Sequence, residues 1–353
     1  VCQGIARSRA IVLAGIADRP VSSAFDYSPY ASSSAFAGNH YFISLDEIAK
    51  SNWHDGNIDR GDFEDGHFIN FEKVTQHKTL ALQRAYNLFQ QSAPKEEMLA
   101  FDEFCVSEHW WLNDYAHFSA LSEHFGTQDW TCWEDNVKKR EKNALAEWEK
   151  KLSKKVGYHK FLQYLFFTQW QKFKETCHSI GIKIIGDIPI YINLESADAW
   201  AHPEILLLDE KTMKPEFVSG VPPDYFSETG QRWGNPLYRW KNKKGKLHVA
   251  TYEWWGNRLQ HLLKLVDLVR IDHFRAFEAY WSIPAEEKTA VNGEWIEGPG
   301  KDFFDWIENK MGKISLIAED LGVITEGVKK LRDELNLPGM KILQFAFDGS
   351  NDN

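Results

Sequence analysis

The chain has 353 residues, 43% hydrophobic and 26% charged, which suits one large globular domain or two ordinary ones. Its formal net charge of -10 would repel a nucleic-acid backbone, so no nucleic-acid partner is expected. Aromatic residues make up 14% of the chain and include 15 Trp. Flat aromatic faces can stack against sugar rings, so carbohydrate is the better expectation, although most of these rings could equally belong to the core.

The four cysteines lie far apart and form no CxxC pair, so neither a zinc site nor a disulfide framework is expected. We expect the protein to reside in a reducing compartment. No run of 18 apolar residues occurs, so no membrane association is expected. Residues 1–25 hold three Arg and one acid around an apolar run at 10–17, a pattern shared with transit and signal segments. Because the chain begins with Val1 rather than Met, a gene fragment is the alternative explanation. We expect a cytoplasmic location, or a plastid if 1–25 is a transit segment.

Residues 26–40 are rich in turn formers and small residues, which predicts an ordered loop. Tyr30 and Asn39 could contact a ligand there, or Tyr30 could simply pack beneath a surface connection. Helical spacing of apolar residues follows in a block ending near residue 180, whose aromatics we expect to pack between helices rather than to touch a ligand. The helices are predicted over 45–50, 71–91, 96–121, 133–155 and 158–179.

The pattern changes after Gly181, where a β-branched run at 182–191 predicts a strand with Asp187 towards its carboxyl end. Residues 215–240 show little secondary-structure signal and many aromatics. Loops of this length in a compact domain are usually functional, so we expect a lid.

The rest of the chain alternates between predicted helices and strands. The stretch 266–277 reads as a buried strand that ends on Arg270, Asp272 and His273. Another strand at 314–322 ends on Glu319. The remaining elements are helices over 252–265, 299–311 and 325–335, the last capped by Thr325, and a strand over 341–348. This alternation favours a (β/α)8 barrel over a doubly wound sheet, and no Gly-x-Gly-x-x-Gly supports a dinucleotide fold.

In a barrel the strand ends converge, so Asp187, Asp272 and Glu319 should meet at one mouth. Two carboxyls about 5 Å apart are the apparatus of retaining glycoside chemistry. Side-chain alternation places Arg270 on the same face as Asp272, where the guanidinium can keep that carboxylate ionised as a nucleophile, although a structural ion pair would look the same. The apolar residues before Glu319 should raise its pKa, and Asp320 should point to the opposite face.

A divalent metal bound by the clustered acids is the competing interpretation, but Arg270 and His273 flank Asp272 where further acids would be needed. His273 itself could donate a hydrogen bond to a sugar hydroxyl or could pack as a satisfied histidine.

From about residue 26 to the end, the chain resembles the amylomaltases, the 4-α-glucanotransferases or disproportionating enzymes of the α-amylase superfamily. Seven motifs in the same order carry the resemblance: SPY at 28–30, SAFAGN at 34–39, GDIPI at 186–190, GVPPDYF at 220–226, GQRWGNP at 230–236, RIDHFR at 270–275 and IAEDLG at 317–322. The resemblance implies a (β/α)8 TIM barrel over 26–353, with a helical insertion at about 71–180 and an aromatic lid at about 215–240.

It also implies a retaining transfer of α-1,4-glucan segments between a donor and an acceptor such as maltooligosaccharides, starch or glycogen. Asp272 matches the family's nucleophile and Glu319 its acid/base, while no metal or other cofactor is expected. The implied substrate-binding residues are Tyr30, Asp187, Trp233, Arg270 and His273.

The sequence also departs from the family. Ala276 stands where the family usually has Gly, and His40 where it usually has Pro. Residues 1–25 lack the family's opening strand, its turn and its second strand, and the chain stops before the His-Asp motif that carries a third catalytic carboxylate. We therefore expect a barrel incomplete at both ends, and a transferase slowed by orders of magnitude. An amylase-type hydrolase and an inactive glycan-binding fragment are the alternatives.

Overall fold

The computed structural model describes residues 9–12, 28, 30–59, 61, 69–225, 227–322 and 324–343. These residues fall into two compact units, each described here by itself. The sheet unit draws on Val1–Ile16, Gly181–Ile192 and Pro203–Asn353, and the helical unit on Ala17–Ile180 and Asn193–His202. Both strand-rich stretches and all the acids at predicted strand ends belong to the sheet unit.

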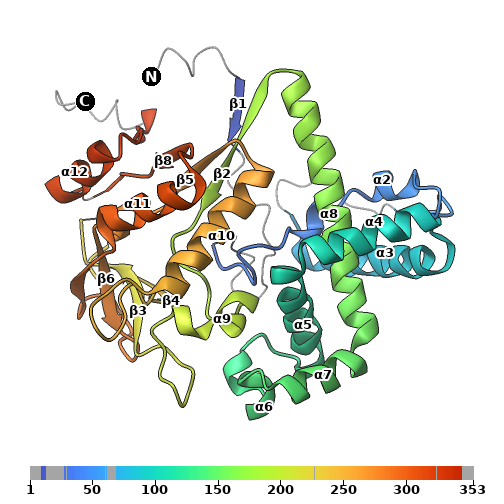
Figure 1. The fold of residues 1–353 in the computed structure, drawn as a ribbon, viewed down its shortest axis with the longest axis horizontal. Coiled ribbons are helices and arrows are strands. Elements are labelled where there is room, and N and C mark those ends of the chain that lie inside the picture. Colours follow the sequence, from blue (N-terminus) through green and yellow to red (C-terminus); the bar gives the residue numbers. More distant parts are fainter. Residues whose placement is uncertain are drawn as a thin grey trace. The chain divides into compact units, whose positions relative to one another are not determined.

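A four-stranded parallel sheet forms the centre of the sheet unit, in the order β1-β2-β5-β8 (Figure 1). Its strands are rich in Ile, Val and Leu, and alternate positions of β5 and β8 are buried. Three of them confirm strands predicted from the sequence. The fourth, β1, corrects the expectation that residues 1–25 hold no opening strand, because it pairs in parallel with β2; a four-residue run is too short to show a period. The strands are β1 Arg9–Val12, β2 Ile182–Ile188, β5 Leu268–Ile271 and β8 Leu316–Ala318.

A second sheet is antiparallel, in the order β4-β3-β6-β7, and it places two strands in the stretch 215–240, where a loop was expected. Within that stretch β3 and β4 pair as a hairpin. At their closest approach a Cβ on Gly220 would lie 2.2 Å from the carbonyl oxygen of Gln231, so the hairpin requires a residue without a side chain. Gly and Pro at such positions hide short strands from pattern analysis. The strands are β3 Phe217–Val221, β4 Gln231–Pro236, β6 Ala279–Pro284 and β7 Glu294–Glu297.

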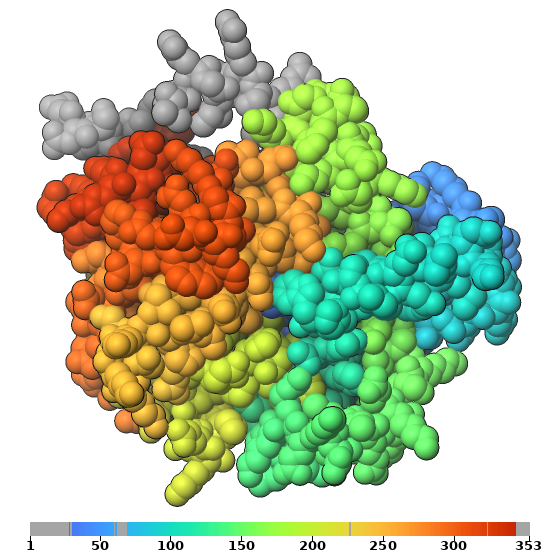
Figure 2. Space-filling model, in the orientation of Figure 1, coloured from blue at the N-terminus to red at the C-terminus, as the bar shows by residue number. Residues whose placement is uncertain are grey.

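Three helices of the sheet unit were predicted from apolar spacing and are confirmed. They are α10 Val249–Leu265, α11 Gly300–Met311 and α12 Glu326–Glu334, with short 3-10 turns η4 Pro203–Ile205 and η5 Phe274–Phe277. The predicted cap is present, because the Thr325 hydroxyl accepts a hydrogen bond from the Val328 amide. Helix α10 packs against β5 and α11, while the outer surfaces of α11 and α12 are visible in red and orange-red in Figure 2.

The helical unit is organised around α8, the long helix that packs against α3, α4, α5 and α7 (Figure 1). The predicted helix over 96–121 is interrupted at Glu108, and the one over 133–155 is interrupted where Arg140 adopts a positive φ of 57°. Aromatic packing between helices is confirmed by the burial of Trp111, Phe118 and Phe161. The elements are η2 His40–Phe42, α2 Leu45–Ala49, α3 Phe71–Ser92, α4 Lys95–Ser107, α5 His109–Phe125, η3 Trp130–Cys132, α6 Asp135–Lys138, α7 Lys142–Lys151, α8 Ser153–Ser179 and α9 Ala197–Ala201.

The loop that precedes α2 is ordered by α8. The Gln163 amide accepts from the Gly38 N–H at 2.7 Å and donates to the Gly38 carbonyl at 3.1 Å. Gly38 also sits against the ring of Phe166, where an added Cβ would lie 2.0 Å from a ring carbon. The predicted ordered loop is confirmed for its described residues. The predicted strand at 341–348 lies largely outside the described residues.

Candidate active site

The register of the parallel sheet brings three chain segments to one edge. Asp187 pairs with Arg270 across β2 and β5, and Arg270 pairs with Ile317 across β5 and β8. Backbone hydrogen bonds continue past the strand ends, because the Asp272 N–H donates to Ile188 and the Glu319 N–H donates to Ile271. The charged side chains therefore emerge at the carboxyl ends of adjacent strands, as the sequence predicts.

Arg270 links two of the acids. Its Nη1 donates to Asp187 Oδ1 at 2.7 Å and its Nη2 lies 2.7 Å from Asp272 Oδ1. The Asp187 side chain is 5% exposed and that of Asp272 is 24% exposed, so the second acid is the one open to a ligand. The predicted placement of Arg270 and Asp272 on one face is confirmed by their contact.

Burial and Arg270 shift the pKa values of the Asp187 and Asp272 carboxyls in opposite directions. Burial raises the pKa of Asp187 to about 6, although Arg270 lowers it. Burial likewise raises the pKa of Asp272 more than Arg270 lowers it. We expected Arg270 to dominate at Asp272, and the net direction is the reverse, because desolvation of the charged form outweighs one ion pair. For Arg270, the pull of Asp187 and Asp272 overcomes burial and keeps its pKa raised.

Glu319 is held by backbone donors. Its Oε2 accepts from the His273 N–H at 3.0 Å and its Oε1 from the Leu321 N–H at 3.0 Å. Burial nevertheless raises the pKa of Glu319, which confirms the direction expected from the apolar residues before it. The neighbouring Asp320 is engaged elsewhere, with Arg332 at 2.5 Å, in agreement with its predicted orientation.

His273 occupies a left-handed backbone conformation, with φ of 52°, directly after Asp272. Its ring meets Trp233 edge-on, with centroids 4.7 Å apart. Burial, helped by the charge of Arg275, lowers the pKa of His273 to about 3, so the imidazole is neutral at ordinary pH. Its buried Nε2 has no hydrogen-bond partner among the described residues, and a buried polar atom of this kind calls for a functional explanation.

Trp233 lies on β4 and is 38% exposed, with its Nε1 donating to Gln231 Oε1 at 3.1 Å. The sheet unit thus contains six of the seven predicted site residues. Five of them, Asp187, Arg270, Asp272, His273 and Glu319, are joined by direct hydrogen bonds, ion pairs or chain adjacency, and Trp233 joins them through the ring contact. The seventh, Tyr30, belongs to the helical unit and is 47% exposed.

The sequence did not point to Met340, whose Sδ accepts from Arg270 Nε at 3.2 Å. A methionine after Pro338 and Gly339 carries no pattern that distinguishes a partner of Arg270 from a core residue. In the described part of the chain, no group of three or more His, Cys, Asp or Glu is arranged to hold a metal ion.

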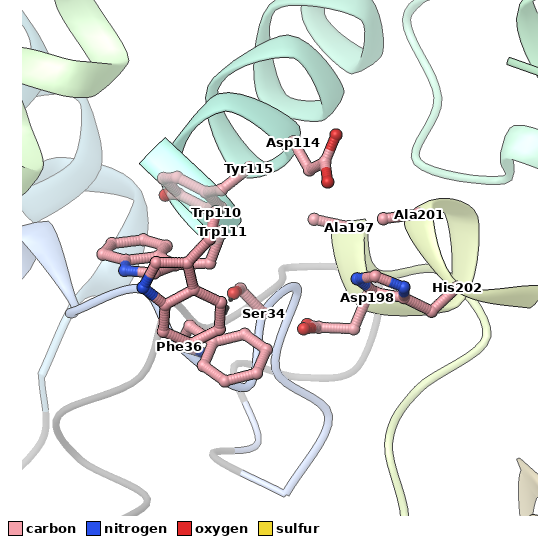
Figure 3. Close-up of a pocket in the computed structure, with 10 residues that line it drawn as sticks. All are labelled: Ser34, Phe36, Trp110, Trp111, Asp114, Tyr115, Ala197, Asp198, Ala201 and His202. Atoms are coloured by element: carbon pink, nitrogen blue, oxygen red, sulfur yellow. Dashed lines mark hydrogen bonds between the residues drawn. The ribbon is translucent and has the colours of Figure 1, made fainter. Parts of the chain in front are cut away.

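A separate small pocket lies within the helical unit, between α5, α9 and the loop around Ser34 (Figure 3). None of the predicted site residues lines it. Its two carboxylates are already bound, Asp114 by Arg140 at 2.5 Å and Asp198 by the Ala35 N–H at 2.7 Å. The pocket is therefore a packing feature of the described structure rather than part of the candidate site.

Fold and site together define a class: a mixed helix-and-sheet protein whose parallel strands end in acids cross-linked by an arginine. A family model described as 4-alpha-glucanotransferase matches residues 7–353, and the chain belongs to that family. It is 45% identical to the 4-alpha-glucanotransferase of Clostridium butyricum, over 92% of this chain and 66% of that protein. It is 47% identical to that of Thermus thermophilus, over 92% of this chain and 64% of that protein. The chain thus spans slightly less than two thirds of the length of these relatives.

A solved structure also matches the fold, that of the amylomaltase from Streptococcus agalactiae in complex with acarbose. The TM-score is 0.85 at 32% identity, covering 98% of this chain and 75% of that one. A plant relative, the chloroplastic/amyloplastic 4-alpha-glucanotransferase of Arabidopsis thaliana, is 40% identical over 92% of this chain and 56% of that protein. Among the described helices of this chain, none combines the length and apolar character needed to cross a membrane.

Proposed function

We propose that the protein transfers α-1,4-glucan segments between maltodextrins by a retaining double displacement. The observation that carries the proposal is the pairing of Asp272 and Glu319 at adjacent strand ends, one carboxyl held by Arg270 and the other by backbone N–H groups. Membership of the 4-alpha-glucanotransferase family supports it. The proposed architecture is a (β/α)8 barrel over 26–353, in which residues 71–180 form a helical insertion and 215–240 border the cleft.

Asp272 attacks the anomeric carbon of the donor glucan, and the bond to the leaving oxygen breaks. Glu319, whose pKa is raised by burial, acts as the general acid and gives its proton to that oxygen. A glucosyl ester of Asp272 results. The Glu319 carboxylate then takes the proton of the 4-hydroxyl of an acceptor glucan, whose oxygen displaces Asp272 and restores the original configuration. Maltooligosaccharides, starch or glycogen supply donor and acceptor.

Other residues bind the sugar. Neutral His273 offers Nε2 to a hydroxyl, and the exposed part of Trp233 offers a stacking surface. We assign Asp187 and Arg270 to orientation of the reacting ring and of Asp272, and Tyr30 to glucan binding. The location we propose is the cytoplasm, or the plastid in a plant host.

Incubation with maltotriose, followed by separation of the products, tests the proposal. Transfer produces glucose and maltopentaose, whereas hydrolysis produces glucose and maltose alone. Asp272→Asn and Glu319→Gln should each lower the rate by roughly a hundredfold or more. Glu326→Gln is the matched control, because this exposed acid in the first turn of α12 pairs with Lys329 at the surface. Hydrolysis without longer products would refute transfer, and binding of maltotriose without turnover would indicate a glycan-binding protein.

A further inference from the structure

The guanidinium of Arg270 has three separate partners. Its two terminal nitrogens contact Asp187 and Asp272, and the remaining Nε donates to Met340 Sδ at 3.2 Å. Every nitrogen of the group is thus directed at a specific atom. The contact to sulfur therefore adds a third point to the two ion pairs that orient the plane of the guanidinium.

Met340 is fixed in turn by its backbone. Its N–H donates to Asp320 Oδ1 at 2.7 Å, and the other oxygen of that carboxyl accepts from Arg332 at 2.5 Å. The preceding Gly339 lies so close that an added Cβ would be 2.4 Å from Asp320 Oδ2. One residue earlier, the Pro338 carbonyl accepts from the Ala318 N–H at 2.9 Å. The segment 338–340 is therefore tied to β8 and to the residue next to Glu319.

We propose that Met340 is a positioning residue for the glucan-transfer site, holding the plane of Arg270 through its sulfur, and that Asp320 fixes Met340 for this purpose. The inference rests on the proposed function of Asp272 and Glu319. It gives Asp320 a role beyond a structural ion pair, because Asp320 connects the strand end carrying Glu319 to the arginine that holds Asp272.

The chemistry of the thioether suits this role. A thioether sulfur accepts a hydrogen bond weakly and carries no charge. It can therefore orient Arg270 without competing with Asp187 and Asp272 for the positive charge. Glu319 also acts on Arg270, together with Asp187 and Asp272. A carboxylate at position 340 would add a fourth acid beside the guanidinium.

Two variants separate the sulfur contact from mere packing. Met340→Leu keeps the apolar bulk but has no acceptor, whereas Met340→Gln offers a carbonyl oxygen at similar reach. We expect Met340→Leu to lower kcat for maltotriose disproportionation about five- to tenfold with KM within twofold. The acid limb of its pH profile should move up by about half a pH unit, because a loosened Arg270 stabilises the carboxylates less. Met340→Gln should recover most of the loss.

Met311→Leu at the end of α11 is the matched control and should leave both kcat and the pH profile unchanged. Asp320→Ala should reproduce the pH shift of Met340→Leu. A lower Tm in Asp320→Ala or Met340→Leu with the acid limb unmoved would overturn the proposal, because that is the signature of structural support alone. Equal losses in Met340→Leu and Met340→Gln would also overturn it.

If the unaltered chain does not act on maltotriose, the proposed function fails, and crystal structures of the protein and of Met340→Leu then decide the positioning role. We expect the Arg270 contact to Asp272 to lengthen beyond hydrogen-bond distance in the variant. An unchanged contact would overturn the role independently of activity.

Discussion

Replacing Arg270 by Lys should separate the two carboxylates that it now connects. The guanidinium reaches Asp187 and Asp272 with different nitrogens, each at 2.7 Å. A lysine ammonium is a single point charge on a flexible stem and cannot reproduce this fork. It will hold one carboxylate and leave the other without its partner.

The size of the effect on activity follows from the loss of one of these two contacts. A hydrogen bond to a charged group contributes about 1.5–3 kcal/mol, so the loss of one of the two should cost about that much. If the lost contact is one that the transition state needs, kcat/KM falls roughly 10- to 150-fold. The pKa of Asp187 is about 6 even beside Arg270, and weaker pairing will raise it further.

The pH dependence of stability follows from the same group. The folded chain holds the Asp187 proton more tightly than the unfolded chain, where the pKa is about 3.9. The contribution of this group to stability therefore falls as the pH rises from about 4 to about 6, and it is constant above that window. In Arg270→Lys the contribution of Asp187 to stability should continue to fall to a higher pH, because its pKa is raised further.

Steady-state kinetics with maltotriose from about pH 4 to pH 9, together with urea unfolding at both ends of this range, measures these effects. Arg84→Lys is the control. Arg84 pairs with Asp55 at the surface of the helical unit, and its replacement should change stability by less than about 0.5 kcal/mol. A change in kcat/KM of less than twofold in Arg270→Lys, with the acid limb in place, would refute the assigned role of the fork.

Three further changes are expected to act through different contacts. Trp233→Ala opens the edge of His273 to water and should raise the ratio of hydrolysis to transfer with maltotriose, so an unchanged ratio of glucose to longer oligomers would count against an acceptor-binding role. Thr325→Ala removes a helix cap and should lower the free energy of unfolding by about 1 kcal/mol in urea, with Thr325→Ser near the original value. Gly38→Ala should destabilise the fold by about 1–3 kcal/mol, because its Cβ meets the Phe166 ring, and an unchanged Tm would show that the ring moves aside freely.

The sequence pattern was sufficient to predict features that depend on neighbouring residues in the chain. Alternation along a strand placed Arg270 and Asp272 on one face, and the apolar residues before Glu319 predicted the direction of its pKa shift. Helices with a clear apolar stripe were found close to their observed bounds. The positions of the acids at strand ends followed from the same reasoning.

Contacts between distant segments could not be obtained in this way. The ion pair of Arg270 with Asp187 depends on the register of β2 against β5, which no single segment determines. The hairpin of β3 and β4 was missed because the close approach of the two backbones requires Gly220, and a glycine weakens the sequence pattern of a strand. Helix breaks at Glu108 and Arg140 were missed because the apolar spacing continues across them while the helical backbone conformation ends there.

The candidate site has a consequence for folding kinetics. Asp187 and Arg270 are 83 positions apart in the chain, and His273 and Glu319 are 46 apart. Parallel pairing over such separations must first close long loops, which makes it slow compared with the formation of helices from neighbouring residues. During refolding from denaturant, the circular-dichroism signal of the helical unit should return before the strand ends meet. Recovery of the proposed transfer activity would then report when β2, β5 and β8 assemble, which we expect to be the slowest folding step.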